Sequence, residues 1–183
     1  MMPRAKELFE RVLAAQRQLG TGEVEEALAK APELREEAVR LLGRGAMLSS
    51  FDRAHALAAY TYATVTTILG LAEARQPTEF VPKIRDLAVD AARRYRRGTE
   101  VWKVLAAAAE MLARAGDSEG AVWAIKKAAQ LETGNDDVVK LSGSIRSMYP
   151  SVFAQVPEDV PGEPPPIPES RRGPSRPAPP PVG

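Results

Sequence analysis

The sequence contains no cysteine and a single histidine, and only 5% of its 183 residues are aromatic. The absence of cysteine excludes disulfide bonds, thiolate zinc sites and a cysteine nucleophile. His55 has no second histidine with which to share a metal ion. We therefore expect it to pack within a helix, and we expect the protein to use neither a metal nor a cofactor.

The chain also lacks an excess of either charge, because Lys plus Arg total 25, Asp plus Glu total 24, and the net charge is +1. This balance supplies no long-range field for nucleic acid or an anionic bilayer, so an electrostatic partner would need a local patch. The first residues, MMPRAKELFERVLAAQ, contain no apolar run. They predict neither a secretion signal nor a transit peptide, and we expect a cytoplasmic protein.

Proline is scarce before position 150 and abundant after it, with eleven of the 16 prolines lying between Pro157 and Gly183. That segment has few large apolar side chains to offset the entropy lost on ordering. We expect residues 150–183 to form a disordered proline-rich tail and residues 1–149 to form the folded domain. Arg171, Pro174 and Pro177 match the basic-x-x-Pro-x-x-Pro pattern of polyproline ligands. The alternative is that the tail is only a tether.

Helix-capping residues and breakers divide residues 1–149 into seven or eight expected helices, which predicts an all-α fold. Pro32 is expected to end one helix and to begin another that runs to Gly43, because proline suits the first position of a helix. Ser, Thr, Asp and Asn are preferred as N-caps. The expected caps are Ser49, Thr78, Thr99, Asp117 and Asn135.

The longest uncharged run is ALAAYTYATVTTILGLA, residues 56–72. A bilayer span needs about 20 mainly apolar residues, whereas this run has 17 and includes four threonines and two tyrosines. We expect a central helix buried by its neighbours rather than a membrane span. Its threonines can donate their hydroxyls to the carbonyl four residues back.

The segment LAAAAEMLARAGDSEGAVWAIKKAAQLETGN, residues 105–135, has small residues where two paired helices would touch. It resembles a tetratricopeptide repeat, a helical hairpin of 34 residues. Thr133 replaces the proline that normally closes the unit. The resemblance implies a right-handed superhelix of hairpins, with a regular repeat at 100–134, a capping helix at 136–148 and irregular hairpins upstream. The residues at the family's signature positions are Leu105, Ala108, Ala109, Leu112, Ala121, Ile125 and Ala128.

The resemblance also implies a surface that binds a partner peptide, on the first helix of the regular hairpin. Trp123 is a candidate interface anchor, because tryptophan is enriched among binding hot spots, and Trp102 is expected in the core. The alternative is an ordinary solvated face. The residues expected on the groove are Lys103, Ala106, Glu110, Ala113 and Arg114.

A cluster of arginines stands at the end of another expected helix. Cations at a helix C-terminus complement its dipole, so stabilisation is one interpretation. The other is a docking patch for an acidic protein or for RNA, although few aromatic residues are interleaved for base stacking. The cluster consists of Arg93, Arg94, Arg96 and Arg97.

No pattern in the sequence indicates catalysis, because it has no nucleophile with a base, no phosphate-binding glycine loop and no metal set. We therefore expect a non-enzymatic adaptor or scaffold subunit that binds a protein or peptide, within a larger assembly or alone. The alternative is an RNA-associated accessory protein that uses the arginine cluster. Self-association through alanine-rich faces is a third interpretation.

Overall fold

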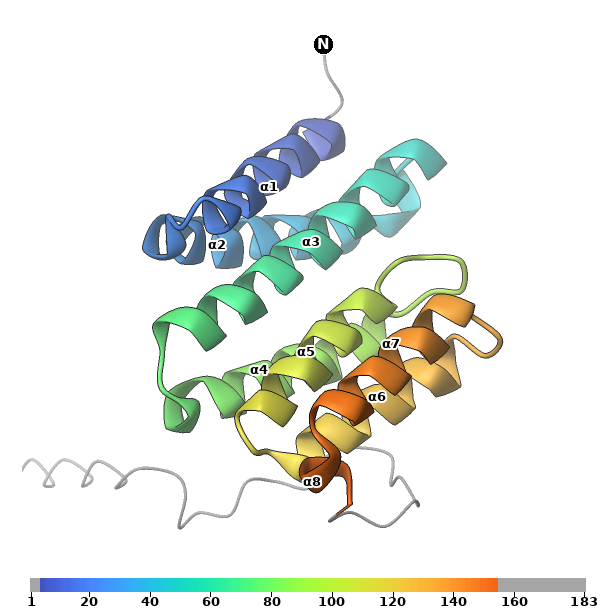
Figure 1. The fold of residues 1–183 in the computed structure, drawn as a ribbon. Coiled ribbons are helices and arrows are strands. Elements are labelled where there is room, and N and C mark those ends of the chain that lie inside the picture. Colours follow the sequence, from blue (N-terminus) through green and yellow to red (C-terminus); the bar gives the residue numbers. More distant parts are fainter. Residues whose placement is uncertain (1–3, 155–183) are drawn as a thin grey trace, which may run out of the picture.

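The computed structural model describes residues 4–154, and over this range the chain is helical without strands, which confirms the expected all-α class (Figure 1). The proline-rich segment with Arg171, Pro174 and Pro177 lies outside the described residues. Pro150, expected to open the tail, instead begins a short helix. The elements are α1 (Arg4–Gly20), α2 (Val24–Leu42), the 3-10 turn η1 (Gly45–Met47), α3 (Ser50–Ala74), α4 (Pro77–Arg94), α5 (Trp102–Arg114), α6 (Ser118–Leu131), α7 (Asp136–Met148) and α8 (Pro150–Phe153).

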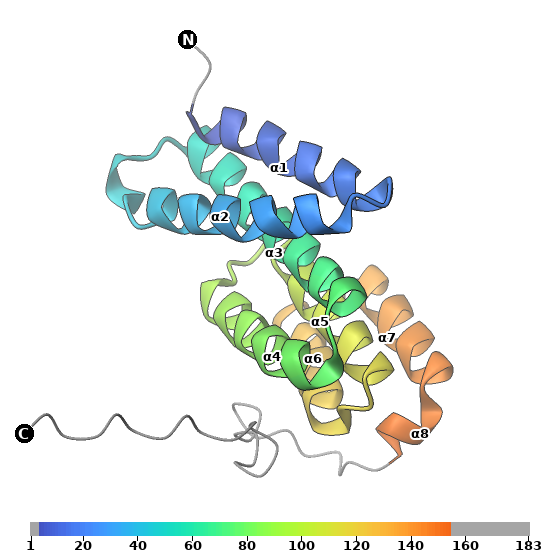
Figure 2. The same cartoon turned by 90° about the vertical axis from the view of Figure 1, so that its left-hand side faces the viewer.

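The long helix α3 lies at the centre of the molecule, between α1 and α2 on one side and α4 and α5 on the other (Figures 1 and 2). Tyr60 and Ile68 are fully buried in it, and Gly70 allows the close approach of Leu28 from α2. The expected threonine bonds form, because Thr61, Thr64, Thr66 and Thr67 each donate to the carbonyl four residues back. No described helix is long and apolar enough to span a bilayer.

The helices pack in a regular order along the chain. α1 contacts both α2 and α3, α3 contacts both α4 and α5, and α5 contacts both α6 and α7. Each pair of consecutive helices therefore has the first helix of the next pair as a neighbour. The contact within the α3–α4 pair is much smaller than the contacts within the α1–α2 and α5–α6 pairs, so the middle pair is splayed.

Three of the expected caps are confirmed and two are wrong. The side chains of Ser49, Asp117 and Asn135 accept backbone N–H groups at the starts of α3, α6 and α7. α4 begins at Pro77 instead of after Thr78, because the fixed φ of proline suits the first turn. Thr99 turns back and donates its hydroxyl to the carbonyl of Arg96, and α5 begins later.

The break expected at Pro32 is also wrong, because α2 runs through Pro32 without interruption. The lost backbone hydrogen bond is outweighed by packing on both sides of the proline. Buried apolar residues continue on one side of the helix before and after Pro32, so the whole of α2 lies against α3. These residues are Ala27, Leu28, Ala31, Leu34, Ala38 and Leu41.

Candidate functional site

The residues expected on the groove of α5 separate into two sets. Lys103 and Glu110 are half-buried and Arg114 is exposed. Their spacing places all three on one face of α5. Ala106 and Ala113 are buried in the core, so they do not form the expected floor of this surface.

Of the two tryptophans, Trp102 packs against the core as expected, whereas Trp123 is buried instead of standing at the surface. Trp123 is only 4% exposed and belongs to the core, whereas Trp102 is half-buried at the start of α5. Trp123 therefore offers no surface to a partner. Val122 and Ala124 on either side of Trp123 are buried as well, so α6 is covered by neighbours on several sides. Helical periodicity cannot identify an outward position on a helix that is buried in this way.

Lys103 is held in place by two residues that the sequence analysis did not identify. Its Nζ donates to Glu100 Oε1 at 2.9 Å and to Tyr62 Oη at 3.2 Å, and it lies 5.5 Å from the centroid of the Tyr62 ring. The Tyr62 hydroxyl also donates to Glu100 Oε2 at 2.9 Å. Tyr62 belongs to α3, so this contact joins the surfaces of α3 and α5.

These contacts set the charges of the group. Burial opposes the charged form of Lys103, but its hydrogen bonds with Glu100 and Tyr62 outweigh burial and raise its pKa. Hydrogen bonds from Lys103 and Tyr62 lower the pKa of Glu100. Both groups are therefore ionised at neutral pH, and the pair presents a lysine and a carboxylate in a fixed arrangement.

Aromatic rings continue the same surface onto α1. The ring of Phe9 lies 5.9 Å from that of Tyr62 and 6.1 Å from that of His55, measured between centroids. Phe9, His55 and Tyr62 are all half-buried, so each keeps part of its ring at the surface. We call Phe9, His55, Tyr62, Glu100 and Lys103 the first-helix surface, since its residues come from α1, from α3, from the turn before α5 and from α5 itself.

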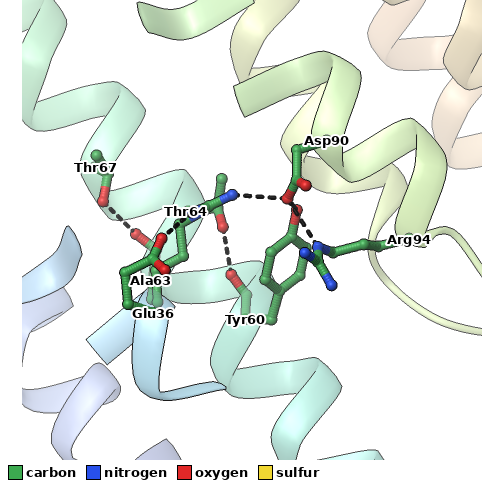
Figure 3. A network of polar contacts seen from close by, with 8 residues as sticks. Glu36, Tyr60, Ala63, Thr64, Thr67, Asp90 and Arg94 are labelled. Carbon is green, nitrogen blue, oxygen red and sulfur yellow. Dashed lines mark hydrogen bonds and ion pairs between the residues drawn. The ribbon is translucent and has the colours of Figure 1, made fainter. Parts of the chain in front are cut away.

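A second polar group links α2, α3 and α4 (Figure 3). Asp90 on α4 accepts from the Tyr60 hydroxyl at 2.6 Å, from Arg35 Nη2 at 2.7 Å and from Arg94 Nε at 2.9 Å. The two guanidinium groups lie 5.5 and 5.6 Å from the centroid of the Tyr60 ring. Burial and the neighbouring carboxylate raise the pKa of Tyr60, so its hydroxyl stays protonated and donates.

The arginine cluster is divided by this arrangement. Arg94 is the last residue of α4 and is engaged with Asp90, whereas Arg93, Arg96 and Arg97 are exposed. Arg96 donates to the carbonyl of Tyr95 in the loop after α4. The four arginines therefore do not form one continuous helical face, because the helix ends between the second and third of them.

The described residues contain no group of three or more His, Asp or Glu side chains placed to hold a metal ion. The carboxylates of Asp90 and Glu100 are each occupied by cationic partners. Aromatic rings and paired charges lie on the outside of the stacked helices. Comparison with protein-family models, with curated proteins and with solved structures finds no match to the chain.

Proposed function

We propose that the protein is a non-enzymatic adaptor or scaffold that binds a protein or peptide through the first-helix surface. The packing order supports this proposal, because each helix contacts the next one and the first helix of the following pair is also a neighbour. Such stacking is typical of helical-hairpin repeats of the tetratricopeptide kind, which form extended binding surfaces. In this scheme α1, α3 and α5 are the first helices of three hairpins and α7 is the capping helix.

The observation that carries the proposal is the unbroken row from Phe9 through Tyr62 to Lys103, which crosses three helices. Half-buried aromatic residues supply a large contact area at a low cost in conformational entropy, and they are enriched at binding hot spots. Glu110 and Arg114 extend the row along α5. A peptide lying across these helices would meet apolar rings at one end and charged groups at the other.

The test is affinity capture from the native cells with the full chain as bait, with nuclease treatment, followed by mass spectrometry. We expect a protein that is retained by the wild type and lost, by about tenfold or more, with Phe9→Ser or Lys103→Glu. The matched control is Lys30→Glu, because Lys30 is exposed on α2, where its Nζ donates to the Gln18 side chain, and it is not part of the first-helix surface.

Two results would contradict the proposal. One is a retained protein that binds all four baits equally, because the first-helix surface would then be irrelevant. The other is capture that disappears with nuclease and falls steeply with salt, which is the signature of phosphate contacts. The second result would favour the RNA-associated alternative.

A further inference from the structure

The turn between α2 and α3 has a hollow on each side. The first hollow, of about 590 Å³, is lined by Leu42, Leu57 and arginines that include Arg53 and Arg93. The second hollow, of about 460 Å³, is lined by Leu41, Met47, Leu48 and Arg44 among others. We call this region the arginine end. It lies apart from Lys103, at the point where α2 and α4 end and α3 begins.

The side chains that line the two hollows are strongly biased in charge. Six are arginines, two are aspartates and none is a lysine, so the lining carries six minus two, or four, positive charges. Asp90 is already paired with Arg35 and Arg94, and Asp52 accepts the Ser49 hydroxyl. Arg4 lies 3.9 Å from Glu37, an acidic residue outside the hollows, and Arg53 donates to the carbonyl of Gly45 in the turn. A region of net positive charge therefore exists in a chain whose total charge is +1.

Exposed apolar side chains stand beside these charges. Met47 is 89% exposed and Phe51 is 53% exposed. Met47 ends η1 and lines the second hollow, whereas Phe51 is in the first turn of α3 and its ring centroid lies 4.2 Å from that of His55. The lining residues Leu42, Leu48 and Leu57 are half-buried, so part of each is accessible. Arginine, methionine and phenylalanine are enriched at protein interfaces, whereas lysine is depleted. The lining of the two hollows shares the enrichment in arginine and methionine and contains no lysine.

This arrangement arises from tertiary structure. Arg53 and Arg93 are far apart in the sequence, and the antiparallel course of α3 and α4 brings them to one hollow. Arg97, which the sequence grouped with Arg93, is not part of the lining. The patch is thus built across helices and a turn rather than along one helix.

We propose that the arginine end binds an acidic segment of a protein partner that also carries apolar side chains. Guanidinium groups bind carboxylates in a bidentate manner, and the leucine-lined hollows are concave, so they suit inserted side chains. A nucleic-acid backbone would leave Met47 and the leucines without a partner. A flat bilayer would not fill the hollows.

The test uses fluorescence anisotropy with the full chain and labelled synthetic peptides. The first peptide is built from repeated Glu-Glu-Leu triplets, the second replaces leucine by serine, and the third replaces glutamate by lysine. We expect the first peptide to bind, the second to bind about tenfold more weakly because it cannot fill the apolar hollows, and the third not to bind. Binding of the first peptide should weaken as salt is added, since part of it depends on charge.

Two variants and one control locate the binding. The double change Arg53→Glu with Arg93→Glu should weaken the affinity for the Glu-Glu-Leu peptide by at least about tenfold. Arg17→Glu with Lys30→Glu makes the same change of charge on α1 and α2 away from the hollows, and should leave affinity nearly unchanged. Met47→Ser alters a side chain that is almost fully exposed, so the fold should persist. Met47→Ser should weaken the affinity for the leucine peptide and leave the affinity for the serine peptide unchanged.

The proposal is overturned if the Glu-Glu-Leu peptide fails to bind at about 100 μM in low salt, if both acidic peptides bind equally, or if the control pair weakens binding as much as the arginine pair. Binding of a single-stranded RNA or of phosphatidylserine vesicles in place of the peptides would also overturn it. Lys103→Glu should leave this binding unchanged, which separates the arginine end from the first-helix surface.

Discussion

Two arginine–aspartate contacts hold helices together in this protein, and they differ in how the carboxylate is shared. Arg85 on α4 meets Asp117 in the turn before α6, with side chains 10% and 12% exposed. Asp117 accepts hydrogen bonds from Arg85 Nε at 2.7 Å, from a second nitrogen of the same guanidinium group and from the backbone N–H of Gly120. The Asp90 side chain, in contrast, is 29% exposed and accepts hydrogen bonds from three side chains on three helices.

The difference is that Asp117 also caps a helix, whereas Asp90 accepts only from side chains, namely Arg35 and Tyr60 on other helices and Arg94 on its own helix. Asp117 caps α6 and also fixes α4 against the α5–α6 hairpin. Asp90 links α2 to α4 beside a hollow of about 680 Å³ between them, and the Nε of Arg35 is buried there without a hydrogen-bond partner. A buried N–H group without a hydrogen-bond partner lowers the net contribution of its contact to folding stability. The contact between Arg85 and Asp117 should therefore contribute more stability.

The largest effect is expected for Asp117→Ala. This change leaves the buried Arg85 without its carboxylate and removes the cap of α6, so we expect the free energy of unfolding to fall by about 4 kcal/mol. Urea denaturation followed by circular dichroism measures it. Asp136→Ala, which removes an exposed carboxylate from the first turn of α7, is the control. A cost no greater than that of the control would show that the contact is not important for stability.

For Asp90→Asn we expect a smaller fall in the free energy of unfolding, about 2 kcal/mol at neutral pH. The amide keeps one acceptor oxygen but loses the charge that faces two guanidinium groups. The same denaturation experiment compares it with Asp86→Asn, one turn earlier on α4 and exposed. If Asp90→Asn costs more than Asp117→Ala, the order of the two contacts inferred above is wrong.

The contribution of Asp90 should depend on pH. Burial opposes its ionisation, but hydrogen bonds from Tyr60 and Arg94 and the charges of Arg94 and Arg35 outweigh burial and lower its pKa. A lowered pKa gives stability that is complete above the unfolded value of about 4 and is lost as pH falls through the folded value. The stability difference between wild type and Asp90→Asn should therefore shrink below about pH 4. A difference that grows in acid would contradict this.

The smallest effect is expected for Gly120→Ala. A Cβ atom at Gly120 would lie 2.2 Å from Asp117 Oδ2 and 3.0 Å from Arg85 Nε, so the carboxylate must move. The gain in helix propensity, about 1 kcal/mol, offsets part of this cost, and we expect the free energy of unfolding to fall by about 1 kcal/mol. In an Asp117→Ala background the closest obstruction is gone and the Arg85 side chain, no longer held by that carboxylate, can shift, so the same change should stabilise the protein. An equal loss in both backgrounds would exclude Asp117 as the cause.

Local rules predicted the features whose hydrogen bonds close within a few residues. Asp117 and Asn135 begin helices because their side chains accept N–H groups two or three residues ahead. The same rules were wrong at Pro32, where burial against α3 outweighs the lost hydrogen bond, and at Thr99, whose hydroxyl finds an earlier carbonyl. Propensity is a weak influence where packing opposes it.

The candidate sites show the same division. Lys103, Glu110 and Arg114 share a face of α5 because helical periodicity requires it. That Tyr62 would meet Lys103 could not be predicted, because the crossing of α3 and α5 determines the contact. The burial of Ala106, Ala113 and Trp123 likewise depends on which neighbours cover each side of α5 and α6.

The sequence by itself determined that the described chain is helical and that residues 56–72 lie in its centre, because apolar periodicity and caps act over short distances. Tertiary structure alone decided which charges meet, including the pairs Arg35–Asp90 and Arg85–Asp117. The physical reason is that apolar packing is not directional. The ordered stacking of the helices fixes the angles and offsets that bring distant side chains within hydrogen-bonding range.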